Sequence, residues 1–162
     1  MNSGQRVFVM ISGLAFLLAA SASATAQKKN ETPRPQYEFE KIVVPGLTAA
    51  EPLRKQVSVA LASDYLEKGA LAWSKARKCV TCHTNGTYMM MRPALTKQLG
   101  KPSADMRKFF VETLASLKTV DFKKMQTGTR PAQAIYIAAG LAEWDAHVTG
   151  KLSPETDDAL RF

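Results

Sequence analysis

The residues best suited to chemistry stand together in the stretch Cys79-Val80-Thr81-Cys82-His83. Cys79 and Cys82 are the two cysteines of the chain, and His83 is one of its two histidines. Cysteines three positions apart on a helical turn present both sulfurs on one side, where they can add to the two vinyl groups of a haem. The imidazole that follows can then bind the iron. The motif therefore predicts one covalently attached haem c, with His83 as an axial ligand of its iron.

Two other kinds of site also use a pair of cysteines at this spacing. A zinc ion needs four ligands, and Cys79, Cys82, His83 and His147 are the set that this chain offers. A thioredoxin-like redox pair usually stands near a βαβ pattern, which is missing from this sequence. A zinc site and a dithiol site are therefore the alternatives to haem attachment.

The first 26 residues have the layout of a secretory signal peptide. Arg6 precedes an apolar run over residues 7–20, and Ala24-Thr25-Ala26 then forms an A-x-A cleavage pattern. The apolar run is about 14 residues long, whereas a transmembrane helix needs about 20. We therefore expect cleavage near Ala26, export to the periplasm or a similar compartment, and no stable membrane span afterwards. An uncleaved membrane anchor is the alternative.

The chain as a whole has more positive than negative charge. The chain has 22 Lys and Arg residues against 14 Asp and Glu residues, which gives a formal net charge of +8. Runs of five or six like charges are absent, so we do not expect nucleic-acid binding. A basic surface favours acidic redox partner proteins through electrostatic steering. A solvated basic surface without a specific partner is the alternative.

The mature chain divides into an arm, a helical domain and a short tail. Residues 27–47 are rich in charge and proline, which predicts an extended linker or surface arm. Residues 48–150 contain the cysteine motif and form the predicted haem domain. Within residues 151–162, Ser153 and Pro154 predict the cap and first residue of a further helix. We interpret this tail as a docking helix or as the point at which a longer protein is cut.

Helical periodicity dominates the predicted haem domain, and no convincing strand alternation is present. A capping box that begins at Thr48 predicts a helix over about 48–62, and Ser63 is a second candidate start for a helix over 64–78. Turn or loop sequence follows at 85–86, 92–95 and 121–129. The later helices are predicted to begin near Ser103 and Pro131. Their apolar stripes are Met106, Phe110, Leu114 and Leu117 in the first, and Ile137, Leu141, Trp144 and Val148 in the second.

The residues around the motif resemble the class I cytochrome c family over roughly 64–148. Gly69, Leu71 and Trp73 are similar to the helix that leads into the family's haem motif, and the sequence Pro-Ala-Leu at 93–95 resembles its proline-containing loop. The resemblance implies an all-α fold, a small bundle of about three to five helices around one haem. The signal peptide and the extended arm would precede this bundle.

The same resemblance implies roles for two residues of the loop. The carbonyl of Pro93 would accept a hydrogen bond from His83 and so orient the imidazole. Arg92 stands where the family usually has glycine, and we expect it either to pair with a haem propionate or to be an exposed surface arginine. The stretch is also similar to cytochrome-like modules that precede squalene-cyclase-like helical repeats in some bacterial proteins. That likeness rests on Cys-His-Thr followed by Tyr88 and Arg-Pro-Ala-Leu at 92–95.

The sixth ligand of the iron has several candidates. The family places a methionine in the loop before its last helix, and Met125 lies at the matching place. A His/Met pair raises the reduction potential, as in electron-carrying cytochromes. The alternatives are His147, one of Met89, Met90 and Met91, and an open or water-ligated iron.

Two classes of function follow from the state of this sixth position. A six-coordinate haem predicts an electron carrier, not an enzyme, that passes single electrons between redox partners. An open distal position predicts a haem enzyme or a gas-binding sensor, with His147 or Arg92 as its polar distal group. The likeness to cyclase-associated modules adds a haem-bearing domain of a larger protein as a further alternative.

Overall fold

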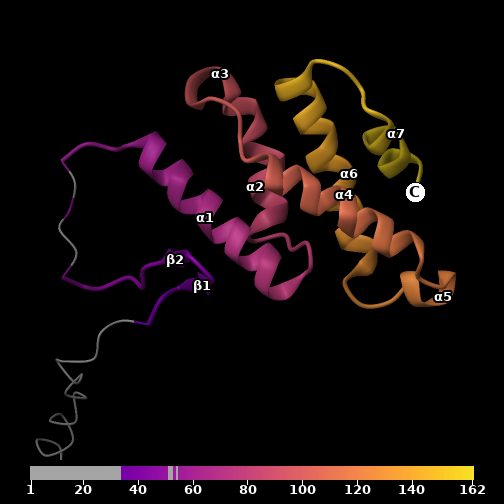
Figure 1. Ribbon diagram of the computed structural model, residues 1–162, viewed down its shortest axis with the longest axis horizontal. Helices are drawn as coiled ribbons and strands as arrows, with labels where there is room; N and C mark the ends of the chain where they lie inside the picture. The colour runs from indigo at the N-terminus through magenta and orange to yellow at the C-terminus, as the bar shows by residue number, and fades with distance from the viewer. Residues whose placement is uncertain (1–33, 51–52, 54) are drawn as a thin grey trace, which may run out of the picture. The chain divides into compact units, whose positions relative to one another are not determined.

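Helices form most of the part of the chain that the structure describes, which confirms the helical prediction (Figure 1). The structure is a computed structural model that describes residues 34–50, 53 and 55–162. The α-helices are α1 (Val59–Arg77), α2 (Asn85–Met91), α3 (Thr96–Leu99), α4 (Ala104–Lys118), α5 (Phe122–Met125), α6 (Arg130–Trp144) and α7 (Pro154–Arg161). Two shorter turns are the 3-10 turn η1 (Pro93–Leu95) and the π-helical turn η2 (Asp145–Thr149). The predicted signal peptide, 1–26, lies outside the described residues.

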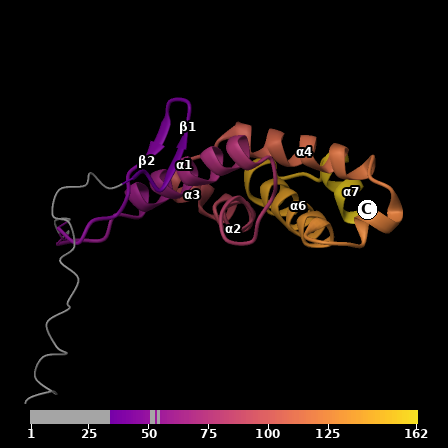
Figure 2. The ribbon, with the colours of Figure 1, turned by 90° about the horizontal axis from the view of Figure 1, so that it is seen from below.

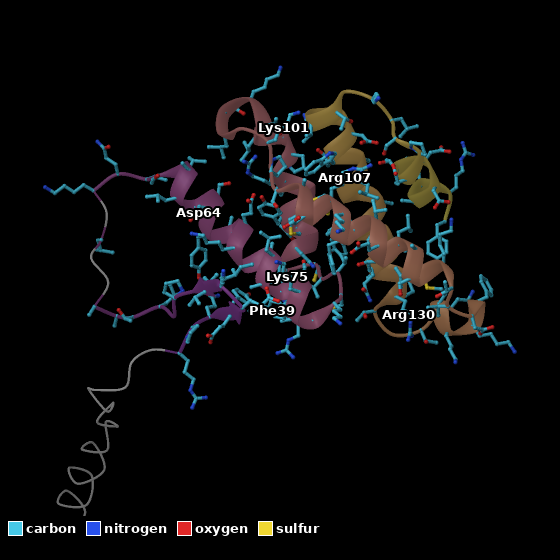
Figure 3. All side chains as sticks on the ribbon, viewed as in Figure 1. Phe39, Asp64, Lys75, Lys101, Arg107 and Arg130 are labelled. Atoms are coloured by element: carbon cyan, nitrogen blue, oxygen red, sulfur yellow. The ribbon has the colours of Figure 1, made fainter. Side chains whose placement is uncertain are left out.

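A two-stranded sheet within the predicted arm corrects the all-α prediction. Strands β1 (Tyr37–Phe39) and β2 (Ile42–Val44) pair antiparallel, with Tyr37 opposite Val44. Val44 is 1% exposed, and the ring of Tyr37 lies 3.3 Å from the position of a Cβ atom on Gly69 of α1. Figure 3 shows Phe39, at the end of β1, near Lys75 of α1, and both residues line one cavity. Strands of three residues are too short to show alternation in the sequence, so the hairpin was not predicted.

A single helix, α1, leads into the cysteine motif. It begins after Ser58, whose hydroxyl accepts a hydrogen bond from an N–H of the first turn, so neither Thr48 nor Ser63 caps it. Residues 51–52 of the predicted capping box lie outside the described residues. The helix ends at Arg77, and its C-cap residue Lys78 has a left-handed conformation (φ 52°) that directs the chain away from the helix axis.

The core lies where α4 and α6 run side by side and meet α2 (Figures 1 and 2). The side chains that these helices bury together are Met106, Phe110, Leu114 and Leu117 from α4, Ile137, Leu141 and Trp144 from α6, and Met89 from α2. The two predicted apolar stripes are therefore confirmed. At Gly140 a Cβ atom would lie 2.9 Å from both Met89 and Phe110, so the glycine permits the close approach of α6 to its neighbours.

Three segments that were predicted as turn or loop contain helical structure instead. Helix α2 occupies 85–91, η1 occupies 93–95 and α5 occupies 122–125. Each is short, so its own periodicity is a poor signal, and tertiary contacts decide its conformation. Among the residues that the structure describes, no helix is long and apolar enough to cross a membrane.

The buried carboxylate of Asp145 joins α6 to the predicted tail helix. The hydroxyl and the backbone N–H of Ser153 both donate to Oδ2 of Asp145, at 2.7 and 2.6 Å, and Thr149 donates to Oδ1 at 3.2 Å. Ser153 caps α7 as predicted, and Gly150 (φ 70°) ends η2. Burial opposes ionisation of Asp145, but the hydrogen bonds from Ser153, Thr156 and Thr149 outweigh it and lower the pKa of the carboxyl.

This lowered pKa predicts an acid-sensitive attachment of α7. The contribution of Asp145 to stability is present above the ordinary pKa of an aspartate, about 3.9, and is lost as the pH falls through the lower pKa of the folded state. We expect Asp145→Asn to reduce the free energy of unfolding by about 1–3 kcal/mol at neutral pH and to weaken its dependence on acid pH. Urea unfolding at a series of acid pH values measures both effects, with the exposed Asp64→Asn as control. Equal acid dependence in wild type and Asp145→Asn would contradict the assignment.

Candidate functional site

The cysteine motif forms an irregular loop between the end of α1 and the start of α2. Cys79 is partly exposed and Cys82 is exposed, and both are free thiols. His83 is also exposed, and its Nδ1 lies 3.7 Å from Sγ of Cys82. The three side chains that the motif assigns to chemistry are therefore accessible from one short loop.

An apolar cavity of about 270 Å³ lies beside His83. Its lining includes Val59 and Leu66 from α1, Met91 from α2, and Leu95 from η1. These four side chains are exposed to 56%, 58%, 64% and 38%, respectively, although each is large and apolar. A contiguous apolar surface of this kind on a protein usually marks a place where something else binds.

The indole of Trp73 packs against the imidazole on another side. The two rings meet edge to face, with centroids 5.6 Å apart and planes at 72°. The indole Nε1 is buried and has no hydrogen-bond partner within the described residues. A buried indole N–H normally donates a hydrogen bond, so this orphaned group fits an acceptor supplied by a bound molecule.

Arg92 lines the same cavity but is 7% exposed, which corrects the alternative of an exposed surface arginine. Its guanidinium donates to Oγ of Ser63 at 2.8 Å, to the carbonyl of Gly100 at 3.1 Å and to the carbonyl of Leu99 at 3.3 Å. All three partners are neutral, and no carboxylate pairs with Arg92 among the described residues. A buried cation without a counter-ion is costly, so an anionic group near this wall would be favoured.

The carbonyl of Pro93 is engaged by another residue. It accepts a hydrogen bond from the hydroxyl of Thr96 at 2.6 Å. The hydrogen bond that the resemblance implied from His83 is not formed among the described residues. Pro93 itself is buried and begins η1, so it helps to place the Leu95 wall of the cavity.

The candidate sixth ligands lie in different places. Met91 shares the cavity with His83. Met125 lines a separate apolar cavity of about 500 Å³, together with Phe122, Ile135 and Phe162. His147 lies in η2, where its Nε2 is 3.3 Å from Oε2 of Glu143. The structure therefore brings neither Met125 nor His147 into the cavity of His83.

The zinc alternative finds no assembled ligand set. Among the described residues, no three His, Cys, Asp or Glu side chains gather as metal ligands. His147, the fourth ligand of that hypothesis, is in contact with Glu143 instead. The motif supplies its two thiols and one imidazole alone, which is the donor set that covalent haem attachment needs.

The residues present fit a haem. Two accessible thiols and an accessible imidazole lie in one short loop, and the imidazole lines an apolar cavity. Within the described residues, the guanidinium of Arg92 at this cavity has no counter-ion, and the indole N–H of Trp73, which packs on another side of the imidazole, has no acceptor. Val59, Leu66 and Ser63 also belong to this site, although nothing in the local sequence connects them with the cysteine motif. Comparison of the chain with family models, with curated proteins and with solved structures finds no match.

Tyr88 closes the cavity with a buried phenol. Its hydroxyl donates a hydrogen bond to Oε2 of Glu67, which also accepts one from the backbone N–H of Ser103 at 3.3 Å. Burial, the hydrogen bond to Glu67 and the negative charge of Glu67 together raise the pKa of Tyr88 far above its ordinary value, and the nearby Arg92 opposes them only in part. These interactions therefore favour the neutral phenol in the folded protein.

The raised pKa of Tyr88 predicts a loss of stability at alkaline pH. The contribution of the neutral phenol is present below the ordinary tyrosine pKa, about 10, and decreases above it because the unfolded chain then ionises more readily. We expect the urea midpoint of the wild type to fall more steeply above that pH than the midpoint of Tyr88→Phe. Urea unfolding followed by circular dichroism at a series of alkaline pH values measures these midpoints. Tyr136→Phe is the matched control, because it also removes one phenol. Parallel curves for wild type and Tyr88→Phe would rule out this role.

Proposed function

We propose that this protein is an exported c-type cytochrome domain that carries one covalent haem and transfers single electrons. The observation that carries the proposal is an apolar cavity lined by His83, whose imidazole lies beside the Cys82 thiol in the loop that also carries the free thiol of Cys79. A planar apolar group tethered at Cys79 and Cys82 would cover side chains that are otherwise exposed to water. A small cytochrome-like helical bundle around the haem is part of this proposal.

The residues of this chain would have distinct roles at the haem. Cys79 and Cys82 would hold it through thioether bonds, and His83 would bind the iron from the adjoining position. Leu66, Met91 and the other apolar residues of the cavity would exclude water. Arg92 would lie near the propionates, where its charge finds a counter-ion. When bound, the haem supplies a one-electron redox centre whose potential depends on its axial ligands and surroundings.

The polar groups near His83 support an electron carrier more than a gas-binding or catalytic site. A distal group must be able to donate to a ligand on the iron. Three of the five N–H groups of Arg92 are donated to Ser63, Leu99 and Gly100, and the hydroxyl of Tyr88 is donated to Glu67. His147 contacts Glu143 outside the cavity, and Trp73, whose indole N–H has no partner among the described residues, does not line the cavity. The proposed function is therefore electron transfer, not catalysis.

The partners and the compartment follow from charge and from the leader sequence. The net charge of +8 supports a docking partner with an acidic surface, which it would attract at long range. The leader pattern that ends near Ala26 supports export, where a haem can be attached to a reduced Cys-x-x-Cys-His motif. A redox partner protein in the periplasm is the class of partner that we propose.

Intact mass of the purified protein tests haem attachment. We expect the wild type, produced together with a haem-attachment system, to have the mass of residues 27–162 plus one haem. The double variant Cys79→Ser, Cys82→Ser removes both thioether bonds and should have no covalent haem, whereas His83→Ala should lose the low-spin spectrum. Lys78→Ala, which leaves the motif intact, serves as the matched control. A wild-type mass without a porphyrin adduct would refute the proposal and leave a zinc or dithiol site.

We propose a methionine as the sixth ligand, and the shared cavity favours Met91 over Met125. The oxidised haem protein should then show the far-red charge-transfer band of methionine ligation, and Met91→Ala should abolish this band. Met125→Ala and His147→Ala should leave it unchanged, because these residues lie outside the cavity of His83. Absorption spectra of the three variants decide between the ligands. Loss of the band in Met125→Ala alone would support the ligand implied by the family resemblance, and carbon monoxide binding by the wild type would indicate an open iron.

A further inference from the structure

The peptide groups between the two cysteines are held by buried side chains from other elements. Asn85 of α2 is 0% exposed; its Nδ2 donates to the carbonyl of Cys79 at 2.9 Å, and its Oδ1 accepts from the N–H of Thr81 at 2.9 Å. Gln133 of α6 is 8% exposed, and its Oε1 accepts from the N–H of Val80 at 3.1 Å. Three consecutive residues of the loop are thus held by hydrogen bonds from two helices.

The side-chain amide of Asn85 has one permitted orientation. Its second Nδ2 hydrogen is donated to Oγ of Ser74 at 2.9 Å, and that hydroxyl is itself a donor to the carbonyl of Ala70 at 2.8 Å. A reversed amide would place oxygen against the carbonyl of Cys79 and NH₂ against the N–H of Thr81. Only a side chain with a donor and an acceptor at these positions satisfies both neighbours. An aspartate would replace the donor with a second acceptor.

Gly86 fixes the loop at one further point. Its N–H donates to the carbonyl of Thr81 at 2.9 Å, and a Cβ atom at this position would overlap that carbonyl oxygen. The first turn of α2 therefore packs directly on the loop, without a side chain between them. The backbone from Cys79 to Thr81 is locked, whereas Cys82 and His83 remain exposed.

We propose that Asn85, together with Gln133, is a positioning residue that sets the spacing at which Cys79 and Cys82 present their thiols for attachment. We call the hydrogen bonds from Asn85 to Cys79 and Thr81, and from Gln133 to Val80, the Asn85 clamp. The clamp is a property of the fold, and its consequence for haem attachment rests on the proposed function. Neither side chain touches the reacting sulfur atoms, so both act through the backbone that carries them.

Hydrogen exchange on the full exported chain, as purified, tests the clamp without requiring haem. We expect protected amides at Val80 and Thr81 in the wild type. Asn85→Ala should speed exchange at Thr81 roughly tenfold or more, the effect of losing about one hydrogen bond, while amides in α4 keep their rates. Asn85→Asp retains the acceptor for Thr81 and should keep that amide protected. Thr113→Ala is the control, because it removes a side-chain hydrogen bond to the carbonyl of Phe109 within α4 and none of the partners of Asn85 or of the loop.

Haem attachment supplies the second readout. We expect Asn85→Ala and Asn85→Asp to lower the fraction of protein with two thioether bonds, measured by intact mass and by the position of the pyridine haemochrome band. Thr113→Ala should match the wild type. If Asn85→Ala does not fold, Asn85→Asp and Thr113→Ala still give the comparison. Asn85→Asp keeps the acceptor for Thr81 and removes the donor to Cys79 and Ser74.

Hydrogen exchange and haem attachment together distinguish failure of the clamp from failure of the proposed function. Unprotected Val80 and Thr81 amides in the wild type, or rates at Thr81 that do not change in Asn85→Ala, would overturn the clamp. Normal double attachment in both Asn85 variants would overturn its positioning role. A protected loop in a wild-type protein that never acquires haem would refute the proposed function and leave the clamp standing.

Discussion

A single buried amide, that of Asn85, determines the geometry around the cysteine motif. An unsatisfied buried polar group costs about 1–3 kcal/mol, so an amide with three partners allows one arrangement of the groups around it. Ser74 contributes one partner from α1, and Cys79 and Thr81 contribute the other two. The helix before the motif, the loop and the helix after it are therefore arranged around the same side chain.

The long helices could be predicted from the sequence because their apolar residues recur at helical spacing. The stripe that begins at Met106 and the cap at Ser153 are found where the pattern placed them. The start of α1 could not be predicted, because Thr48, Ser58 and Ser63 have the same capping chemistry. Tertiary contacts select among them: Ser63 lies within α1 and accepts a hydrogen bond from Arg92.

Only the reactive residues of the site could be predicted from the sequence, not the residues that position them. Cys79, Cys82 and His83 are evident from their spacing, whereas the pair Asn85-Gly86 predicts only a turn, because Asn-Gly is typical of turns. Its partner Gln133 is distant in sequence, and no local pattern connects the two residues. The burial of Arg92 likewise depends on contacts that exist only after α1 and the C-terminal end of α3 have come together.

The hydrogen bonds that hold the loop backbone bear on the rate of electron transfer in a protein of the proposed kind. A redox centre exchanges electrons quickly when the atoms around it shift little between its two oxidation states, that is, when its reorganisation energy is low. The carbonyl of Cys79 and the N–H groups of Val80 and Thr81 are fixed dipoles, held by Asn85 and Gln133. In an electron carrier of the proposed kind, these dipoles would keep their orientation as the charge changes, and only the solvent and the exposed side chains would respond.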